Sequence, residues 1–425
     1  MNLSLRLPFI ASAPEAAARP AGPPLTGERM ARARLARTPR IGPVTFHEMV
    51  GHYGSAAAAL DALPSLAKRA GFQSAPRPPG AAALRDEADA LAALGGRFVI
   101  AGDADYPAAL TQLGDAPPVL SVIGDAALLS RSAIAVVGAR NASVGGRRLA
   151  TDFAAGLGGR GFVVVSGLAR GVDTAAHRAA LPTGTVAVLA GGVDVVYPPE
   201  NDDLYREIAA AGAIVSEAPL GAVPQARHFP RRNRIVSGLS LGVLVVEAAL
   251  QSGSLITARQ AADQGREVFA IPGSPLDPRA RGCNRLIRDG AHLVEEIADI
   301  AAILPDPAAA PAPPPRPLAP PAPAPKRRRT RPAEPAPMPL GGGQSGHDDP
   351  SPTPGVDAQP IEFMETSDPE AVAERIAAAL TRAPTPVDEI IRCCHVSPAA
   401  ATAALLDLEL AGRIERRPGN MIALI

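Results

Sequence analysis

Six short runs of apolar, largely β-branched residues constrain the fold of this chain more than any other feature. Each run is apolar throughout, which is typical of strands covered on both faces. The intervals between the runs are long enough for helices and predict βαβ crossovers. We therefore expect a doubly wound, mostly parallel α/β sheet built from residues 134–137, 162–165, 186–189, 213–215, 242–246 and 268–271, with edge strands from residues 97–101 and 119–123.

The length of 425 residues exceeds one ordinary core and predicts two or three domains. We expect a disordered tail over residues 1–24, a small helical domain over residues 25–75 and the sheet domain over residues 80–304. In the helical domain, Gly42-Pro43 joins two helices. A Pro/Ala-rich run with a basic cluster at Lys326 to Arg329 predicts a linker over residues 305–366, which cannot bury enough apolar surface to fold.

The last segment, residues 367–425, is expected to hold three helices and a hairpin, which together make a winged helix. Ser397 and Pro398 provide an N-cap and a first-turn proline for the third helix. That helix carries Asp407 and Glu409 but no lysine or arginine, whereas a reader of the DNA major groove needs hydrogen-bond donors there. The pattern favours a protein-contact or regulatory module over a sequence-specific DNA reader such as a transcription factor.

The overall charge is balanced, with 42 basic and 42 acidic residues. Any nucleic-acid binding must therefore come from local patches. The three cysteines form neither a disulfide framework nor a metal-ligand spacing, which fits a reducing cytoplasm. Because no apolar span reaches the roughly 20 residues of a membrane helix, we expect a soluble cytoplasmic protein that needs no membrane, metal or cofactor.

The segment Phe229-Pro230-Arg231-Arg232-Asn233-Arg234-Ile235 places three arginines within a stretch of four positions, close after an aromatic residue. It lies in a run, residues 218–246, that contains no Asp or Glu. The arginine fork matches phosphate oxygens, and without a nearby acid these forks are expected to have no intramolecular partner. The segment predicts binding of a polyanion, with Phe229 available to stack on a base.

Gly-rich turns follow several of the predicted strands, where open α/β sheets bind ligands. The backbone amides of these turns are expected to bond phosphate oxygens beside the arginines. No dinucleotide fingerprint and no phosphate loop of the Gly-x-x-x-x-Gly-Lys-[Ser/Thr] type is present. The residues predicted to bind nucleic acid are Gly138, Arg140, Ser166, Gly167, Arg170, Phe229, Arg231, Arg232, Asn233, Arg234, Gly253 and Ser254.

Asp173 and His177 lie four residues apart on one helix face, which is the spacing of an acid–base pair. No nucleophile or metal-ligand set accompanies them. We therefore expect hydrogen bonds that orient the fold rather than catalysis.

The motifs at residues 137–140, 166–173, 229–235, 251–258 and 282–287 together resemble the DNA processing protein A family, also called DprA or Smf. The resemblance covers roughly residues 25–296. It implies an extended Rossmann-like domain that binds single-stranded DNA, an N-terminal sterile-alpha-motif-like domain, and often a C-terminal winged helix. It further implies a homodimer that protects incoming strands in natural transformation and helps to load the recombinase RecA.

An alternative is an enzyme, since nucleotide phosphoribohydrolases of the lysine-decarboxylase-like family have similar sheets. In that case Glu247, at the end of a predicted strand, would take part in the chemistry. The Gly-Gly-x-Gly-Thr-x-x-x-Glu run of that family is missing here. The sequence therefore favours binding without catalysis.

Overall fold

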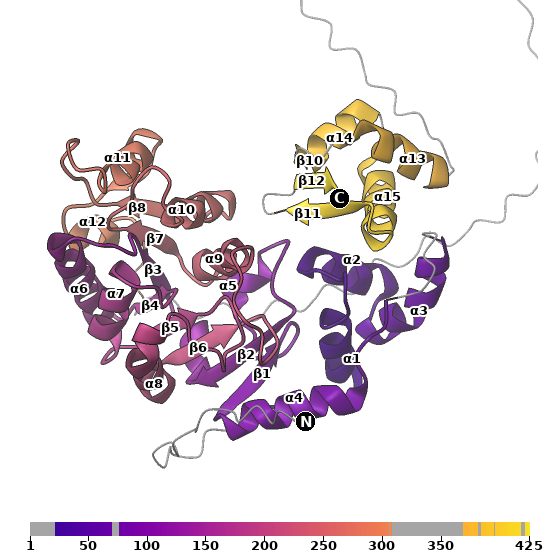
Figure 1. Ribbon diagram of the computed structural model, residues 1–425, viewed down its shortest axis with the longest axis horizontal. Helices are drawn as coiled ribbons and strands as arrows, with labels where there is room; N and C mark the ends of the chain where they lie inside the picture. The colour runs from indigo at the N-terminus through magenta and orange to yellow at the C-terminus, as the bar shows by residue number, and fades with distance from the viewer. Residues whose placement is uncertain are drawn as a thin grey trace, which may run out of the picture.

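The computed structural model describes residues 22–69, 76–305, 307, 369–380, 384–394, 396–417 and 421–425. These residues form a large α/β domain and two smaller domains beside it (Figure 1). Nearly all of the expected N-terminal tail lies outside the described residues. The same holds for most of the expected linker, including the basic cluster at Lys326 to Arg329.

The large domain is built on one nine-stranded sheet with the order β1-β2-β6-β5-β4-β3-β7-β8-β9. Strands β6 to β9 of this order run parallel, whereas β2 is antiparallel to both β1 and β6. The strands are β1 Gly96–Ile100, β2 Val119–Gly124, β3 Ala133–Val137, β4 Val163–Ser166, β5 Thr185–Val188, β6 Ala213–Ser216, β7 Gly242–Val245, β8 Glu267–Ala270 and β9 His292–Leu293. The predicted sheet and its two edge strands are confirmed. Strand β9 was not predicted, because two residues are too few to show an apolar pattern.

Two cores enclose the sheet, because successive residues of each central strand face opposite sides. Val163 and Val165 enter one core and Val164 enters the other. The first face is covered by α5 Ala108–Thr111, α9 His228–Gly238, α10 Ser254–Asp263 and α11 Arg281–Arg288. The second is covered by α6 Val144–Gly159, α7 Val172–Ala180, α8 Asp202–Ala211 and α12 Ile297–Ala301. The short helices η1 Ala126–Ser130 and η2 Pro199–Asn201 lie in connections.

The N-terminal domain consists of α1 Gly27–Ala36, α2 Pro43–Tyr53 and α3 Ala56–Arg69, and α4 Ala81–Ala93 leads from it to the sheet. Its core contains the fully buried Leu35, Phe46 and Met49. Pro43 occupies the first turn of α2, where its missing N–H leaves no intrahelical bond unmade. The predicted helix-Gly-helix arrangement is confirmed.

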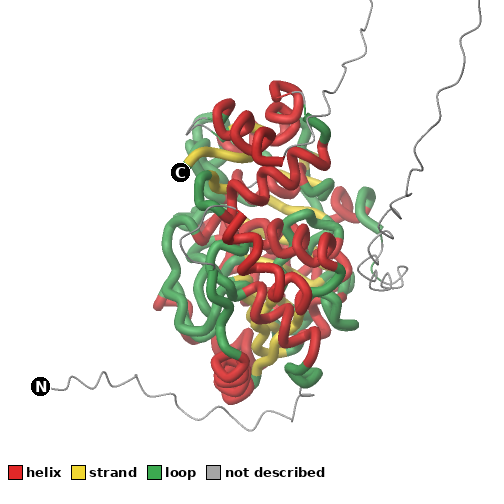
Figure 2. The backbone as a smooth tube through the Cα atoms, turned by 90° about the vertical axis from the view of Figure 1, so that its right-hand side faces the viewer, coloured by secondary structure: helices red, strands yellow, loops and turns green. Residues whose placement is uncertain are grey.

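The C-terminal domain contains α13 Pro369–Ala379, α14 Val387–Cys394 and α15 Pro398–Leu410 with a sheet of order β10-β12-β11. Its strands are β10 Thr385–Pro386, β11 Ile414–Arg417 and β12 Met421–Leu424. Ser397 caps α15 as predicted, since its hydroxyl accepts the Ala400 N–H at 3.2 Å. Three helices and a hairpin confirm the winged helix, although the hairpin turn at residues 418–420 lies outside the described residues. The domain lies at one end of the molecule, next to the N-terminal helices (Figures 1 and 2).

Candidate nucleic-acid interface

A pocket of about 170 Å³ opens where β4 and the neighbouring parallel strands end. Carboxyl ends of parallel strands are where open α/β sheets usually bind ligands. Its lining comes from the turns after β3 and β4, from the segment before α8 and from the first turn of α9. The lining residues are Arg140, Gly167, Ala169, Arg170, Tyr197, Pro198, Pro199, Glu200 and Phe229.

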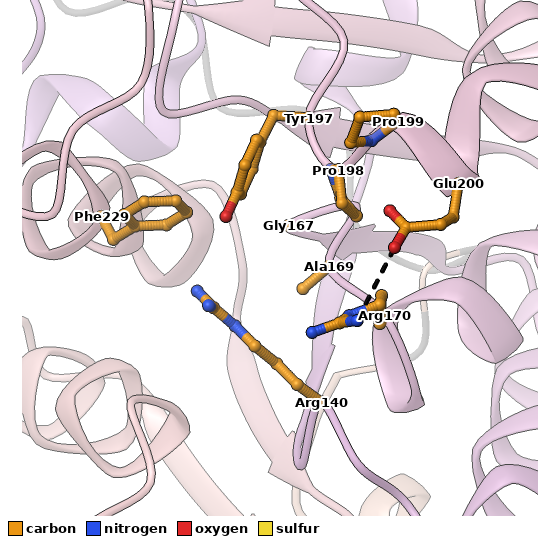
Figure 3. Close-up of a pocket in the computed structure, with 9 residues that line it drawn as sticks. All are labelled: Arg140, Gly167, Ala169, Arg170, Tyr197, Pro198, Pro199, Glu200 and Phe229. Atoms are coloured by element: carbon orange, nitrogen blue, oxygen red, sulfur yellow. Dashed lines mark ion pairs between the residues drawn. The ribbon is translucent and has the colours of Figure 1, made fainter.

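A cation–aromatic cluster stands on one side of this pocket (Figure 3). The Arg140 guanidinium lies 5.0 Å from the centre of the Phe229 ring, and the Tyr197 ring packs edge-on against Phe229 at 5.8 Å. Arg140 is exposed and Tyr197 is 46% exposed. The cluster therefore offers aromatic surface and positive charge to a ligand at the same place.

Arg170 stands on the opposite side of the pocket, 3.6 Å from Glu200 (Figure 3). Both side chains are more than half exposed, at 62% and 60%. An ion pair this exposed contributes little free energy. The Arg170 guanidinium can therefore exchange its partner for a phosphate at small cost.

Arg232 lies beneath the pocket instead of lining it. Its Nη1 donates to the Val188 carbonyl at 2.9 Å, and its Nε is buried with no hydrogen-bond partner among the described residues. Burial lowers the pKa of Arg232 to about 10, and Asp173 opposes this shift, so the guanidinium stays charged at neutral pH. A Cβ at Gly167 would stand 1.7 Å from Arg232 Nη1, which explains the glycine at that position. The expectation that Arg232 contacts phosphate directly is wrong, because the side chain is buried.

Arg234 is also buried, with only 5% of its side chain exposed. It forms an ion pair with Glu217, lies 3.6 Å from an Asp115 carboxylate oxygen and donates to the Asp115 carbonyl. The expectation that these arginines lack intramolecular partners is wrong for Arg234. Glu217 stands just before the acid-free run, and Asp115 comes from a distant part of the chain.

Asp173 and His177 shape the turn after β4. The Asp173 carboxylate accepts the N–H groups of Gly167 at 3.1 Å and Ala169 at 3.2 Å, and His177 Nε2 accepts the Leu168 N–H at 3.3 Å. Burial lowers the pKa of His177 to about 3, so the ring is neutral at neutral pH and can accept this bond. The predicted orienting role is confirmed. The Gly167 amide is therefore engaged by Asp173, contrary to the expectation that it bonds phosphate.

Glu247 follows β7, and its carboxylate lies at the N-terminus of α6, where a Rossmann fold usually holds a phosphate. Its carboxylate accepts the Ser143 N–H at 2.9 Å and the Ser143 hydroxyl at 2.5 Å, and that hydroxyl accepts the Gly146 N–H at 2.8 Å. A Cβ at Gly146 would lie 2.3 Å from the Glu247 carboxyl carbon. Glu247 thus takes the place of an anion at this helix start.

We expect Glu247→Ala to lower the free energy of unfolding by about 1–3 kcal/mol, because it strands the Ser143 donors in a partly buried site. Glu247→Gln, which keeps an acceptor, should cost less. Urea denaturation of both variants measures the difference. Equal stability of the wild type and Glu247→Ala would show that the carboxylate is not a structural cap.

The other predicted residues divide into buried and exposed positions. Gly138 packs against Val172, and the buried Ser166 hydroxyl donates to the Val136 carbonyl at 2.7 Å. Ser254 is buried with its hydroxyl 2.7 Å from that of Ser252. Arg231 is exposed on α9. Of the predicted set, Arg140, Gly167, Arg170 and Phe229 line the pocket, Arg231 and Asn233 follow on α9, and Gly253 stands at the start of α10.

Sequence reasoning missed Tyr197 and Glu200 as pocket residues. Tyr197 follows the Gly191-Gly192 turn after β5, so its place beyond a parallel strand was a usable signal.

Across the described ranges, no helix has the length and apolar character needed to span a membrane. The same residues contain no cluster of three or more His, Cys, Asp or Glu side chains able to hold a metal ion.

Three family models match the chain in order. The model for DNA recombination-mediator protein A matches residues 97–305, a DprA-like N-terminal HHH domain matches residues 26–90, and a DprA winged helix domain matches residues 362–420. Protein Smf from Synechocystis is 34% identical over 339 residues, which cover 76% of this chain and 79% of that protein. DNA processing protein DprA from Streptococcus pneumoniae is 46% identical over 199 residues, covering 46% of this chain and 70% of that one.

The X-ray structure of DNA processing protein A from Streptococcus pneumoniae has a similar fold, with a TM-score of 0.56 and 34% identity. The match covers 66% of this chain and 98% of that chain. The agreement therefore extends over nearly all of that structure.

Proposed function

Because the chain belongs to the DNA recombination-mediator protein A family, which includes the DprA and Smf proteins, we propose that its pocket binds single-stranded DNA. The observation that carries this proposal is the cluster of Arg140, Phe229 and Tyr197 at the pocket, facing Arg170. Exposed guanidinium groups neutralise phosphates. Exposed rings stack on bases, and these must be unpaired to be reached.

The proposed mechanism is binding without chemistry. The carboxylates near the pocket have other partners: Asp173 holds backbone amides, Glu247 caps α6 and Glu200 pairs with Arg170. The nucleotide phosphoribohydrolase alternative requires a carboxylate free to act on a nucleotide. The position of Glu247 under Ser143 and Gly146 speaks against that role.

A single pocket contacts few nucleotides, so two linked pockets on one strand would gain from their effective concentration. This supports the proposal that the chain acts as a homodimer, as the family resemblance implies. We further propose that it protects incoming strands in natural transformation and helps to load RecA. Formation of RecA filaments on single strands, measured with and without this chain, tests the last step.

A salt titration comparing a poly-dT oligonucleotide with a duplex of equal length tests the binding proposal. We expect tighter binding of the single strand at every salt concentration, together with a log–log salt slope of about −0.7 for each phosphate neutralised. Preferential binding of the duplex would contradict the proposal. Release of free base from nucleoside monophosphates would instead support the enzyme alternative.

A further inference from the structure

The C-terminal domain contacts α2 of the N-terminal domain through a charged cluster. Arg416, on β11, donates from Nη2 to the Glu48 carboxylate at 3.0 and 3.2 Å. The same guanidinium donates from Nε to Glu409 on α15 at 3.0 Å. The Thr45 hydroxyl, on α2, donates to the same Glu409 oxygen at 2.8 Å. One arginine therefore joins carboxylates from two domains that lie far apart in the sequence.

We propose that the face of α2 that carries Thr45 and Glu48 is a docking surface for this chain's own winged-helix domain, with Arg416 as its central contact. The Arg416 side chain is only 12% exposed, and those of Glu48 and Glu409 are 21% and 14% exposed. Charge-assisted hydrogen bonds in such a partly dry setting are stronger than those of a surface ion pair.

The interface depends on Arg416, because the two carboxylates would not be stable so close together without this cation. Glu48 and Glu409 would face each other as like charges if Arg416 were absent. Burial raises the pKa of Glu48, and Arg416 opposes this shift. Glu409 belongs to the same domain as Arg416, so their bond orients the guanidinium toward α2 before docking.

Apolar packing supports the same interface. Leu406, on α15, packs against the N-terminal core that contains Leu35, Phe46 and Met49. The helix that a winged helix would otherwise present to DNA is thus turned toward protein. This agrees with its lack of basic residues.

The arginines of the hairpin are already paired within the described part of the domain. Arg413 pairs with Glu374 at 2.6 Å and Arg417 pairs with Glu415, while Arg416 serves the interface. The Arg413 and Arg417 pairs are about half exposed and contribute little free energy, so they do not themselves exclude nucleic acid. Arg416 differs, because its guanidinium is only 12% exposed and is held between two carboxylates of the protein.

Helix α2 also contacts the large domain on another side. His47 Nε2 lies 2.9 Å from the Ala116 carbonyl, next to Asp115, which pairs with Arg234 of α9. Docking therefore places the winged helix on a helix that is itself fixed to the domain carrying the pocket. None of the described residues of the C-terminal domain lines that pocket.

The test uses the full chain with a specific protease site inserted between residues 340 and 345. After cleavage, we expect the C-terminal fragment of the wild type to co-elute with the rest of the chain in gel filtration at micromolar concentration. Arg416→Ala should weaken this association by about tenfold or more, because it leaves two partly buried carboxylates without their cationic partner. Arg417→Ala is the matched control, since Arg417 pairs only with Glu415 of its own hairpin in the described structure.

Glu48→Gln probes the interface from the other side without touching the winged helix. It should also release the fragment, and combining it with Arg416→Ala should add less than the two single effects together. Separate elution of the cleaved wild-type fragment would overturn the proposal, as would equal release by Arg416→Ala and Arg417→Ala. None of these measurements involves DNA, so they are independent of the proposed single-strand binding.

Discussion

Arg140→Ala is expected to weaken the binding of single-stranded DNA about tenfold at low salt, and to make the log–log salt slope less steep by about 0.7. Arg140 is exposed at the pocket and has no carboxylate partner among the described ion pairs, so its charge is available to a phosphate. It also stands 5.0 Å from the Phe229 ring. Loss of the side chain therefore removes a phosphate contact and one neighbour of the stacking platform.

Phe229→Ala should act differently, because a ring contributes stacking and carries no charge. We expect a loss of about 1–3 kcal/mol in binding free energy with an unchanged salt slope. The double variant should lose less than the sum of the single losses, since the two side chains contact each other. Fluorescence anisotropy with a labelled oligonucleotide at several salt concentrations separates these effects.

Arg148→Ala provides the control for these binding measurements. Arg148 lies on α6 away from the pocket lining, is 83% exposed and pairs with Asp152 at 3.6 Å. Its loss should change single-strand affinity by less than about twofold, since the pair is largely exposed to solvent. Equal losses for Arg140→Ala and Arg148→Ala would mean that the pocket is not the binding site.

The sheet could be predicted from the sequence because each of its main strands is buried on both faces. Residues 133–137 are all buried, and such strands leave continuous apolar runs in the sequence. The winged helix could be predicted from its caps, since Ser397 and Pro398 mark the start of α15. In contrast, β9 and β10 are two residues long and depend on pairing with distant strands. Their existence follows from tertiary structure.

The candidate site could be predicted only in part, because the burial of an arginine depends on residues far away in the sequence. Arg232 is buried because it donates to Val188, and Arg234 because Asp115 and Glu217 surround it. The sequence around α9 does not show that Val188 and Asp115 are partners, and Glu217, although it lies just before this segment, gives no sign of which arginine it pairs with. The same reasoning applies to Glu247, whose engagement with Ser143 spans more than a hundred residues.

Arg231 and Arg234, both on α9, should differ strongly in what their loss does to the free energy of unfolding. Arg234→Ala should lower the free energy of unfolding by about 3 kcal/mol, because it removes a buried guanidinium and leaves two partly buried carboxylates without their cationic partner. In the structure the Arg234 side chain is 5% exposed, and those of Glu217 and Asp115 are 23% and 35% exposed. Arg231→Ala, three residues earlier on an exposed position, should change stability by less than about 0.5 kcal/mol.

In single-strand binding the order of the two effects should reverse, with Arg231→Ala causing the larger loss. Arg231→Ala is expected to weaken single-strand binding and to reduce the magnitude of the salt slope by about 0.7, since the side chain is exposed on α9, the helix that carries Phe229 into the pocket. Arg234→Ala, assayed at a temperature where it remains folded, should retain the salt slope of the wild type. Urea denaturation and anisotropy on both variants provide the measurements. A stable Arg234→Ala variant with a reduced salt slope would show that Arg234 leaves its carboxylates to bind phosphate, and that the arginine segment acts on DNA as one unit.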